Sequence, residues 1–172
     1  VLLATLTGVA GDLGPSGKLD MEADFLLANP GAGTEPGTTE PNEIIGTEAG
    51  ETLSGTPGDD IITALGGNDI LYGFAGEDVL DGGAGLDRLY GGFDADTFVF
   101  ATGTTLDIVY DFEDGVDQIQ LSGMTFDELA IESYRTTGTQ ISFGDDRMIL
   151  RDVDRGLISE DDFIPDPTLV IT

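Results

Sequence analysis

The chain has 172 residues, and 34 acidic against six basic residues give it a formal net charge of −28 at pH 7. This length accommodates one domain, or one domain with a flanking segment. The charge opposes compaction unless cations bind, and it argues against nucleic acid and anionic membranes as partners. Cysteine and histidine are both absent, which excludes disulfides, Cys/His zinc sites and histidine-based catalytic triads.

The first 29 residues differ in texture from the rest, and we interpret them as the tail of an upstream domain. Residues 1–10 are apolar but too short to cross a bilayer, and they lack the basic region of a signal peptide. No membrane insertion is therefore expected. Residues 19–28 predict a short helix that ends before Pro30. Residues 30–45 predict a linker, because most of this segment is Gly, Thr, Pro and Glu.

Between Gly46 and Val99, a nine-residue unit of the form G-x-x-G-x-D-x-L-x occurs six times without insertion or deletion. Its sixth position is always acidic and its eighth is always apolar. The sixth positions are Glu51, Asp60, Asp69, Asp78, Asp87 and Asp96, and the eighth positions are Leu53, Ile62, Leu71, Leu80, Leu89 and Phe98. This fixed period predicts a solenoid in which each unit is one rung, stable only when stacked on its neighbours.

The composition of the unit predicts a turn followed by a strand. Glycines in the first six residues permit turn conformations whose carbonyl groups converge, and the last three residues form a short strand with the eighth side chain inward. Calcium takes about six to eight oxygen ligands and accepts carbonyl groups together with carboxylates. Because one turn supplies too few oxygens, the unit predicts calcium sites that are completed by a second, stacked turn.

Residues 46–99 resemble the β-roll of the RTX (hemolysin-type) calcium-binding nonapeptide-repeat family. The fifth unit, Gly-Gly-Ala-Gly-Leu-Asp-Arg-Leu-Tyr at residues 82–90, matches the repeat G-G-x-G-x-D-x-U-x. The resemblance implies an all-β fold, in which a parallel β-roll is followed by a β-rich C-terminal cap. It also implies that two units form one coil, so that turns on the same edge are two units apart.

The same resemblance implies where metal would bind. The carboxylates would form two rows, with Asp60, Asp78 and Asp96 on one edge and Glu51, Asp69 and Asp87 on the other. Roughly four calcium ions would lie between successive members of these rows. Carbonyl donors would come from the glycine turns at Gly58, Gly67, Gly76, Gly83 and Gly85. Further sites are expected where Asp87 or Asp96 meets the cap near Asp107 and Asp117.

Three units depart from the family pattern. The first unit has Ala49 and Glu51 where the family has glycine and aspartate, so its site is expected to be weak or empty. Ala64 replaces the first glycine of the third unit, and Asp94 replaces the second turn glycine of the sixth. These substitutions make the turns at those positions less regular candidates.

The period ends at residue 99, and the rest of the chain predicts a non-repetitive cap. Strands are expected at residues 97–101, 106–112 and 118–121, and a hairpin is expected from residues 139–143 and 147–151. Thr125 and Ser159 each begin a capping-box pattern that predicts a helical turn. A cap covers the apolar face and the strand edges that the last rung of a solenoid would otherwise expose.

Residues 95–121 also resemble the region that follows the repeats in type I secreted proteases and related RTX proteins. This resemblance implies an extracellular bacterial protein whose partner is the type I secretion machinery, with a secretion signal within residues 100–172. The function expected is that of a calcium-binding module that folds on extracellular calcium and serves secretion and stabilisation of an exported protein.

Two alternatives remain open at this point. The chain is an accessory module of a secreted hydrolase, lyase or epimerase, with a polysaccharide or an upstream catalytic domain as partner, or it is a calcium-stiffened segment of an adhesin or surface-layer protein. No catalytic residue is expected, although two carboxylates would suffice for glycoside chemistry. Tyr72 and Tyr90 are interpreted as packing residues. Arg147, Arg151 and Arg155 are interpreted as members of intramolecular ion pairs rather than as an anion site.

Overall fold

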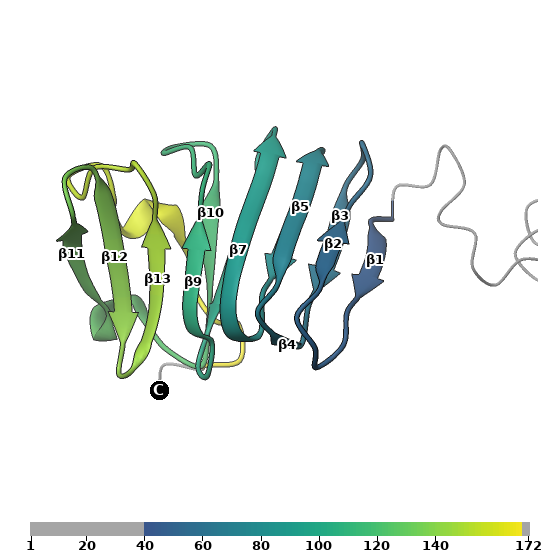
Figure 1. Ribbon diagram of the computed structural model, residues 1–172. Coiled ribbons are helices and arrows are strands. Elements are labelled where there is room, and N and C mark those ends of the chain that lie inside the picture. Colours follow the sequence, from purple (N-terminus) through teal and green to yellow (C-terminus); the bar gives the residue numbers. More distant parts are fainter. Residues whose placement is uncertain (1–39, 170–172) are drawn as a thin grey trace, which may run out of the picture. The chain divides into compact units, whose positions relative to one another are not determined.

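Two parallel-stranded layers form a β-solenoid in the computed structural model, which describes residues 40–169. Figure 1 shows the strands following one another along a common axis. Among these residues there is no α-helix, and two short 3-10 helices, Phe126–Glu128 and Glu160–Asp162, interrupt the strands. The predicted all-β solenoid is confirmed.

The two sheets divide the strands between them. Sheet A runs in the order β1 (Asn42–Ile45), β3 (Asp60–Thr63), β6 (Val79–Asp81), β8 (Thr97–Ala101), β10 (Gln118–Ser122) and β14 (Phe163–Ile164). Sheet B runs in the order β2 (Thr52–Ser54), β5 (Ile70–Ala75), β7 (Ala84–Phe93), β9 (Thr105–Val109), β13 (Asp146–Leu150), β12 (Gly138–Phe143) and β11 (Ala130–Tyr134), and β4 (Gly66–Gly67) pairs beside β7.

The strand register shows that one coil consists of two nonapeptides. Ile70 pairs with Arg88, and Leu53 pairs with Leu71, each pair separated by two units of the sequence. Successive units therefore alternate between sheet A and sheet B. Turns that lie on the same edge of the solenoid are two units apart, as the family resemblance implies.

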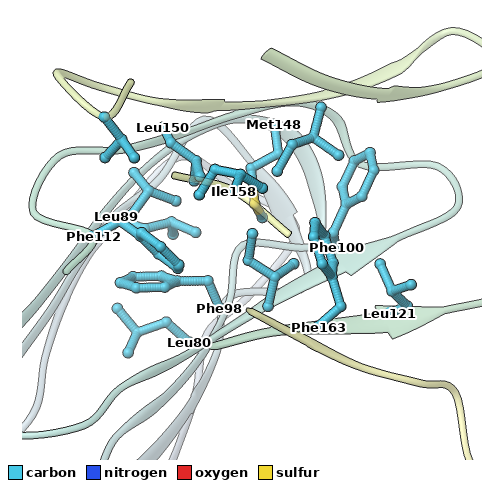
Figure 2. Close-up of a cluster of buried hydrophobic side chains, with 14 of the residues drawn as sticks. Leu80, Leu89, Phe98, Phe100, Phe112, Leu121, Met148, Leu150, Ile158 and Phe163 are labelled. Carbon is cyan, nitrogen blue, oxygen red and sulfur yellow. The ribbon is translucent and has the colours of Figure 1, made fainter. Parts of the chain in front are cut away.

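The inward side chains of the repeat form the core of the roll. The eighth-position residues of units two to six, Ile62, Leu71, Leu80, Leu89 and Phe98, are fully buried. Figure 2 shows Leu89 of sheet B packed with Leu80 and Phe98 of sheet A. Leu53 of the first unit is only partly buried, because β2 is the edge strand of sheet B and pairs with β5 alone among the described strands. The strand alternation predicted from three residues per unit is confirmed.

The cap continues the two sheets and closes the core. Phe100, Met148 and Phe163 bring side chains from β8, β13 and β14 into the cluster drawn in Figure 2. Strands β12 and β13 form the predicted antiparallel hairpin, in which Phe143 pairs with Asp146. Thr125 and Ser159 both close capping boxes, but each begins a 3-10 helix of three residues.

Two segments differ from the structure expected from the sequence, and a third lies outside the described residues. Residues 42–45, assigned above to the linker, form β1 because Asn42-Glu43-Ile44-Ile45 repeats the polar-x-apolar-x end of a unit. The repeat pattern is incomplete here, since asparagine replaces the aspartate and Glu40 replaces the second turn glycine. The strand expected at 106–112 ends at Val109, since the chain turns where the Asp111 carboxylate accepts a hydrogen bond from the Gly91 N–H at 3.0 Å. The helix expected at residues 19–28 lies outside the described residues.

Residues 40–169 include no helix with the length and apolarity to cross a membrane.

The core geometry predicts a difference between two neighbouring residues of β6. Leu80 is fully buried, whereas Val79 points outward and is only partly buried. We expect Leu80→Ala to lower the free energy of unfolding by about 2–5 kcal/mol, because it leaves a cavity between the sheets. Val79→Ala should cost less than about 1 kcal/mol. Denaturant unfolding in saturating calcium measures both, and equal losses would contradict the assigned orientation of β6.

Candidate metal centre

Carboxylates of the repeat form a continuous row on one edge of the solenoid. The backbone N–H of Asp60 donates to Asp78 Oδ1 at 2.8 Å, and that of Asp78 donates to Asp96 Oδ1 at 3.1 Å. The N–H of Asp96 donates to Asp117 Oδ1 at 2.9 Å, so the row extends into the cap. At the other end the Asn42 side-chain amide donates to Asp60 Oδ1 at 2.6 Å. A neutral amide therefore ends a row of acids.

A second row lies on the opposite edge. The backbone N–H of Glu51 donates to Asp69 Oδ1 at 2.6 Å, and that of Asp69 donates to Asp87 Oδ1 at 2.8 Å. Asp107 pairs in register with Asp87 and continues this row into the cap. The structure thus brings together the sequence-predicted acids in the two predicted rows, with Asp107 and Asp117 as the last members.

These carboxylates are buried, and several of their oxygens have no partner. Relative exposure is 0% for Asp69 and Asp87 and 1% for Asp78. The Oδ2 atoms of these three residues, and both carboxylate oxygens of Asp107, are buried without a hydrogen-bond partner. A buried carboxylate with an unpaired oxygen is costly unless a cation or donor compensates it. The orphaned oxygens therefore fit the requirements of a bound cation.

The first glycine of the unit makes room for the carboxylate. A Cβ on Gly55 would lie 2.5 Å from Asp60 Oδ2 and 2.6 Å from the Gly73 carbonyl oxygen. A Cβ on Gly73 would collide with Asp78 Oδ2 in the same way and lie 2.6 Å from the Gly91 carbonyl oxygen. Each carboxylate thus lies against the turn of its own unit, with a backbone carbonyl of the next coil beside it. Sequence analysis treated these glycines only as turn formers.

Four of the five glycines expected to supply carbonyl donors adopt left-handed backbone conformations. The φ angles are 122° at Gly67, 113° at Gly76, 74° at Gly83 and 148° at Gly85. Gly58 does not share this conformation, and a Cβ placed there would find its nearest atom 4.0 Å away. The structure therefore gives a steric reason for the glycine at four of the five positions and none at Gly58.

The irregular units show where the pattern is under strain. Leu65, Phe74 and Asp94 take φ angles of 71°, 86° and 76°, a region that favours glycine. In the first unit Glu51 is partly exposed, and its carboxylate accepts a hydrogen bond from the Thr47 N–H at 2.7 Å. Asp60 accepts the equivalent hydrogen bond from the Thr56 N–H at 2.6 Å but is fully buried, so partial exposure is what distinguishes Glu51.

Fifth-position side chains also link the coils, which sequence analysis missed. The N–H of Glu77 donates to Asp59 Oδ1 at 2.9 Å, and the N–H of Leu86 donates to Asn68 Oδ1 at 3.0 Å. These bonds run in the opposite direction along the chain to those of the sixth position. The sequence signal for these hydrogen bonds is the polar side chain directly before the repeat aspartate, Asp59 in unit two and Asn68 in unit three.

The acids lie in rows rather than in clusters. Among residues 40–169 no point gathers three or more acidic side chains into a group that could hold a metal ion. The available donor set is one or two carboxylates with the backbone carbonyls of two stacked turns. Calcium accepts such a mixture of oxygens, whereas magnesium demands a rigid octahedral shell and retains water.

Burial changes the protonation of the rows. The pKa of Asp78 is raised to about 7, chiefly by burial and also by the charges of Asp60 and Asp59, while a hydrogen bond from the Asp60 backbone N–H opposes the shift. Burial likewise raises the pKa of Asp96 to about 7, with additional repulsion from Asp117. For Asp107, burial and the adjacent Asp87 raise the pKa well above its usual range. A bound cation would oppose each of these shifts.

Comparisons with known proteins agree with this geometry. The model of the RTX calcium-binding nonapeptide repeat matches residues 45–73 and 72–104, with four copies. A subunit of the mannuronan C5-epimerase from Azotobacter vinelandii, solved in solution, is 30% identical with a TM-score of 0.59. That alignment covers 81% of this chain and 90% of the subunit. The chain belongs to the RTX calcium-binding nonapeptide-repeat family.

A second subunit of the same epimerase is also 30% identical, with a TM-score of 0.57 over 79% of this chain and all of that subunit. A search of curated protein sequences finds no match. The RTX assignment identifies the repeats as calcium-binding units of a β-roll, and both similar structures are repeat modules that accompany an enzyme. The alignments cover more of the chain than the nonapeptides alone, so the likeness extends beyond the array.

Two glycines of the RTX turns offer a matched test. We expect Gly73→Ala to raise the calcium concentration needed for folding by about tenfold or more, because its Cβ would occupy the place of the Asp78 carboxylate. Gly58→Ala should shift that midpoint by less than about twofold, since the Cβ meets open space. Circular dichroism during calcium titration measures both variants. Similar shifts would contradict the turn geometry.

The raised pKa values give a pH dependence whose sign depends on calcium. The pKa of Asp78 and Asp96 in the metal-free fold is about 7, above the ordinary value of 3.8. The metal-free fold therefore binds more protons than the unfolded chain, and its free energy of unfolding falls as pH rises between these values. We expect metal-free protein to gain β structure on acidification from about pH 7 to about pH 5.

With calcium the effect of pH should reverse, because protons and metal compete for the same oxygens and calcium affinity falls with pH. The measurement is circular dichroism across pH on metal-free protein, with calorimetric calcium binding at each pH. Metal-free protein that loses structure on mild acidification would contradict the raised pKa values.

Proposed function

We propose that this RTX module folds when it meets extracellular calcium and stabilises an exported protein. The observation that carries this proposal is the pair of buried carboxylate rows with unpaired oxygens at Asp69, Asp78, Asp87 and Asp107. Without a cation these like charges repel one another along each edge. With a cation between successive members, the same rows join one coil to the next.

The free energy of calcium binding is large enough to switch the module between unfolded and folded states. A site filled at about ten times its dissociation constant adds roughly 1.4 kcal/mol to folding. About four coupled sites in the array then add roughly 6 kcal/mol, which is comparable to the net stability of a domain. Further sites at Asp107 and Asp117 would couple the cap to the array. Such a chain is unfolded at low calcium and folded at the millimolar calcium found outside cells.

The proposed organisation follows the sequence analysis with one adjustment. We propose that residues 46–99 are the RTX roll, with β1 as an additional strand before it, and that the cap follows from residue 100. We place the type I secretion machinery as the partner of the cap and the extracellular space as the location. Export through a narrow channel requires an unfolded chain, which low cytosolic calcium would maintain.

A second function is favoured by a specific observation. Both similar structures are subunits of an enzyme that acts on mannuronan, an acidic polysaccharide, and the chain covers nearly all of each. We propose as the second candidate that this module accompanies a catalytic domain that acts on a polysaccharide. Both functions depend on the same calcium-loaded roll.

A calcium titration tests the proposal. We expect a sigmoidal gain of β structure between roughly 0.1 and 1 mM calcium, and no such gain with magnesium. Asp78→Ala should shift the midpoint more than Glu51→Ala, because Asp78 lies between two coils of its row whereas the Glu51 carboxylate binds its own turn. Circular dichroism with calorimetry gives the midpoint and the number of ions.

Two results would count against this function. A chain that is fully ordered in excess chelator would show that calcium does not control folding. Equal shifts for the two variants would show that the strong and weak rungs are wrongly assigned.

A further inference from the structure

A groove of about 440 Å³ lies on the outer face of sheet B, where the roll meets the cap. Its floor is Ile108 of β9 and Ile149 of β13, which pair in register. One wall is Tyr110 with Arg151, and the other is Tyr134 with Arg135 in the turn between β11 and β12. The groove is separate from the acidic turns, because its residues point away from the core while their neighbours Val109 and Leu150 are buried in it.

The charge of this face is opposite to that of the rest of the molecule. The chain has only six basic residues against 34 acidic ones, and two of the six, Arg135 and Arg151, line the groove. Arg88 lies in register beside Ile108, on the same outward face. The one acidic residue in the lining is Asp152, whose Oδ2 is 3.9 Å from Arg151 Nε, with both side chains more than half exposed. Such an exposed pair is weak and leaves the guanidinium available.

The aromatic side chains hold the arginines in place and extend the surface. The guanidinium carbon of Arg151 lies 5.0 Å from the centre of the Tyr110 ring, and that of Arg135 lies 5.2 Å from the Tyr134 ring. Tyr110 stacks on Tyr90 at 4.6 Å, and Tyr90 stacks on Tyr72 at 4.9 Å. This row of phenol rings crosses three strands of sheet B and leads from the RTX repeats to the groove.

Sequence analysis interpreted these residues differently. It treated Tyr72 and Tyr90 as packing residues, and it expected Arg147, Arg151 and Arg155 to form intramolecular ion pairs. Among the described residues only Arg151 has a carboxylate within ion-pair distance, and Arg155 donates instead to the carbonyl oxygens of Ile131 and Ile158. The tyrosines do stack on one another, and the row they form ends at an arginine.

We propose that this groove binds an acidic oligosaccharide, with Arg135 and Arg151 on its carboxylates and Tyr110 and Tyr134 against its sugar rings. Guanidinium groups bind carboxylates bidentately, and those preoriented on aromatic rings lose little freedom on binding. Aromatic rings present flat apolar surface with a polar edge. Thr136 and Thr137 lie in the same lining. The Thr137 hydroxyl donates to Asp152 Oδ1 at 2.7 Å, so its oxygen can still accept a hydrogen bond from a sugar hydroxyl.

The size and surroundings of the groove favour this ligand over other anions. The tyrosine row continues the binding surface beyond the groove, which suits an extended chain rather than a small acid. Nucleic acid carries a denser negative charge, which the acidic residues of this protein outside the groove would repel. A uronic acid chain has one carboxylate per sugar and a flat apolar face between charges. The site requires the folded roll but not the ions themselves.

The test uses the full chain in millimolar calcium, with circular dichroism confirming that every variant is folded. The probe is an oligogalacturonate of a few sugars, and the matched control ligand is the same oligosaccharide with its carboxyl groups reduced to alcohols. We expect the acidic form to bind at least about tenfold more tightly, as two charge-assisted contacts would give. Backbone amide shifts at Tyr110, Arg135 and Arg151 should move on binding.

Arginine variants inside and outside the groove separate binding in the groove from a general effect of positive charge on this face. The double change Arg135→Ala and Arg151→Ala should weaken binding by at least about tenfold. Arg147→Ala removes an exposed arginine of β13 that does not line the groove, and it should change affinity by less than about twofold.

Equal binding of the acidic and reduced oligosaccharides, or unchanged affinity in the double variant, would overturn the proposal. So would binding of anionic lipid vesicles in place of the oligosaccharide. Loss of these effects in a chain that still folds on calcium leaves the proposed function intact, so the two failures are distinguishable.

Discussion

The stacking of like charges is the constraint on which the whole fold depends. The carboxylates of successive coils follow one another along each edge, and at Asp69, Asp78 and Asp87 a backbone N–H group satisfies only one of the two oxygens. The remaining oxygens of Asp69, Asp78 and Asp87 are buried without partners. The core is thin, with one inward apolar side chain per unit. Its burial must offset the repulsion between the carboxylates unless a bound cation reduces that repulsion. RTX turns bind calcium, and a calcium ion would reduce this repulsion.

The glycines of the turn follow from the same constraint. Gly73 and Gly91 leave no room for a Cβ because the carboxylate of their own unit occupies that space. The coil is therefore as thin at its edges as backbone allows, which lets a carbonyl of one coil approach the carboxylate of the next. Replacement of turn glycines in some units, as at Leu65 and Phe74, forces these residues into left-handed backbone conformations. The array tolerates this strain where the side chain points to solvent.

Different surfaces of the module carry different chemistry. The edges of the solenoid hold the acidic rows, while the outer face of sheet B carries aromatic and basic side chains from both the repeats and the cap. Position nine supplies Tyr72 and Tyr90, and the cap supplies Tyr110 and Arg151, so the surface arises only when the cap docks on the roll in this register. Folding driven by calcium at the edges would thereby create a surface for a second ligand on the face.

The repeat made much of this predictable from sequence. A period of nine residues fixes which side chains point inward, so the core residues and the strands of the array follow directly. The division of the acids into two rows follows instead from the resemblance to RTX repeats, in which two units form one coil. Asn42 shows where a pattern search fails: it occupies the aspartate position of a unit that has Glu40 in place of the second turn glycine, so pairing of Asn42 with Asp60 reveals it. The groove was out of reach because Tyr110, Tyr134 and Arg151 come together through non-repetitive strand pairing, for which the sequence carries no period.

Diffraction from crystals grown with calcium, or with terbium in its place, tests the central claim most directly. Anomalous scattering locates the metal independently of any assumption about ligands. Metal peaks are expected along both edges within bonding distance of Oδ2 of Asp69, Asp78 and Asp87, and none is expected in the groove on sheet B. An ordered solenoid whose edges contain only water next to these oxygens would contradict calcium binding between the coils.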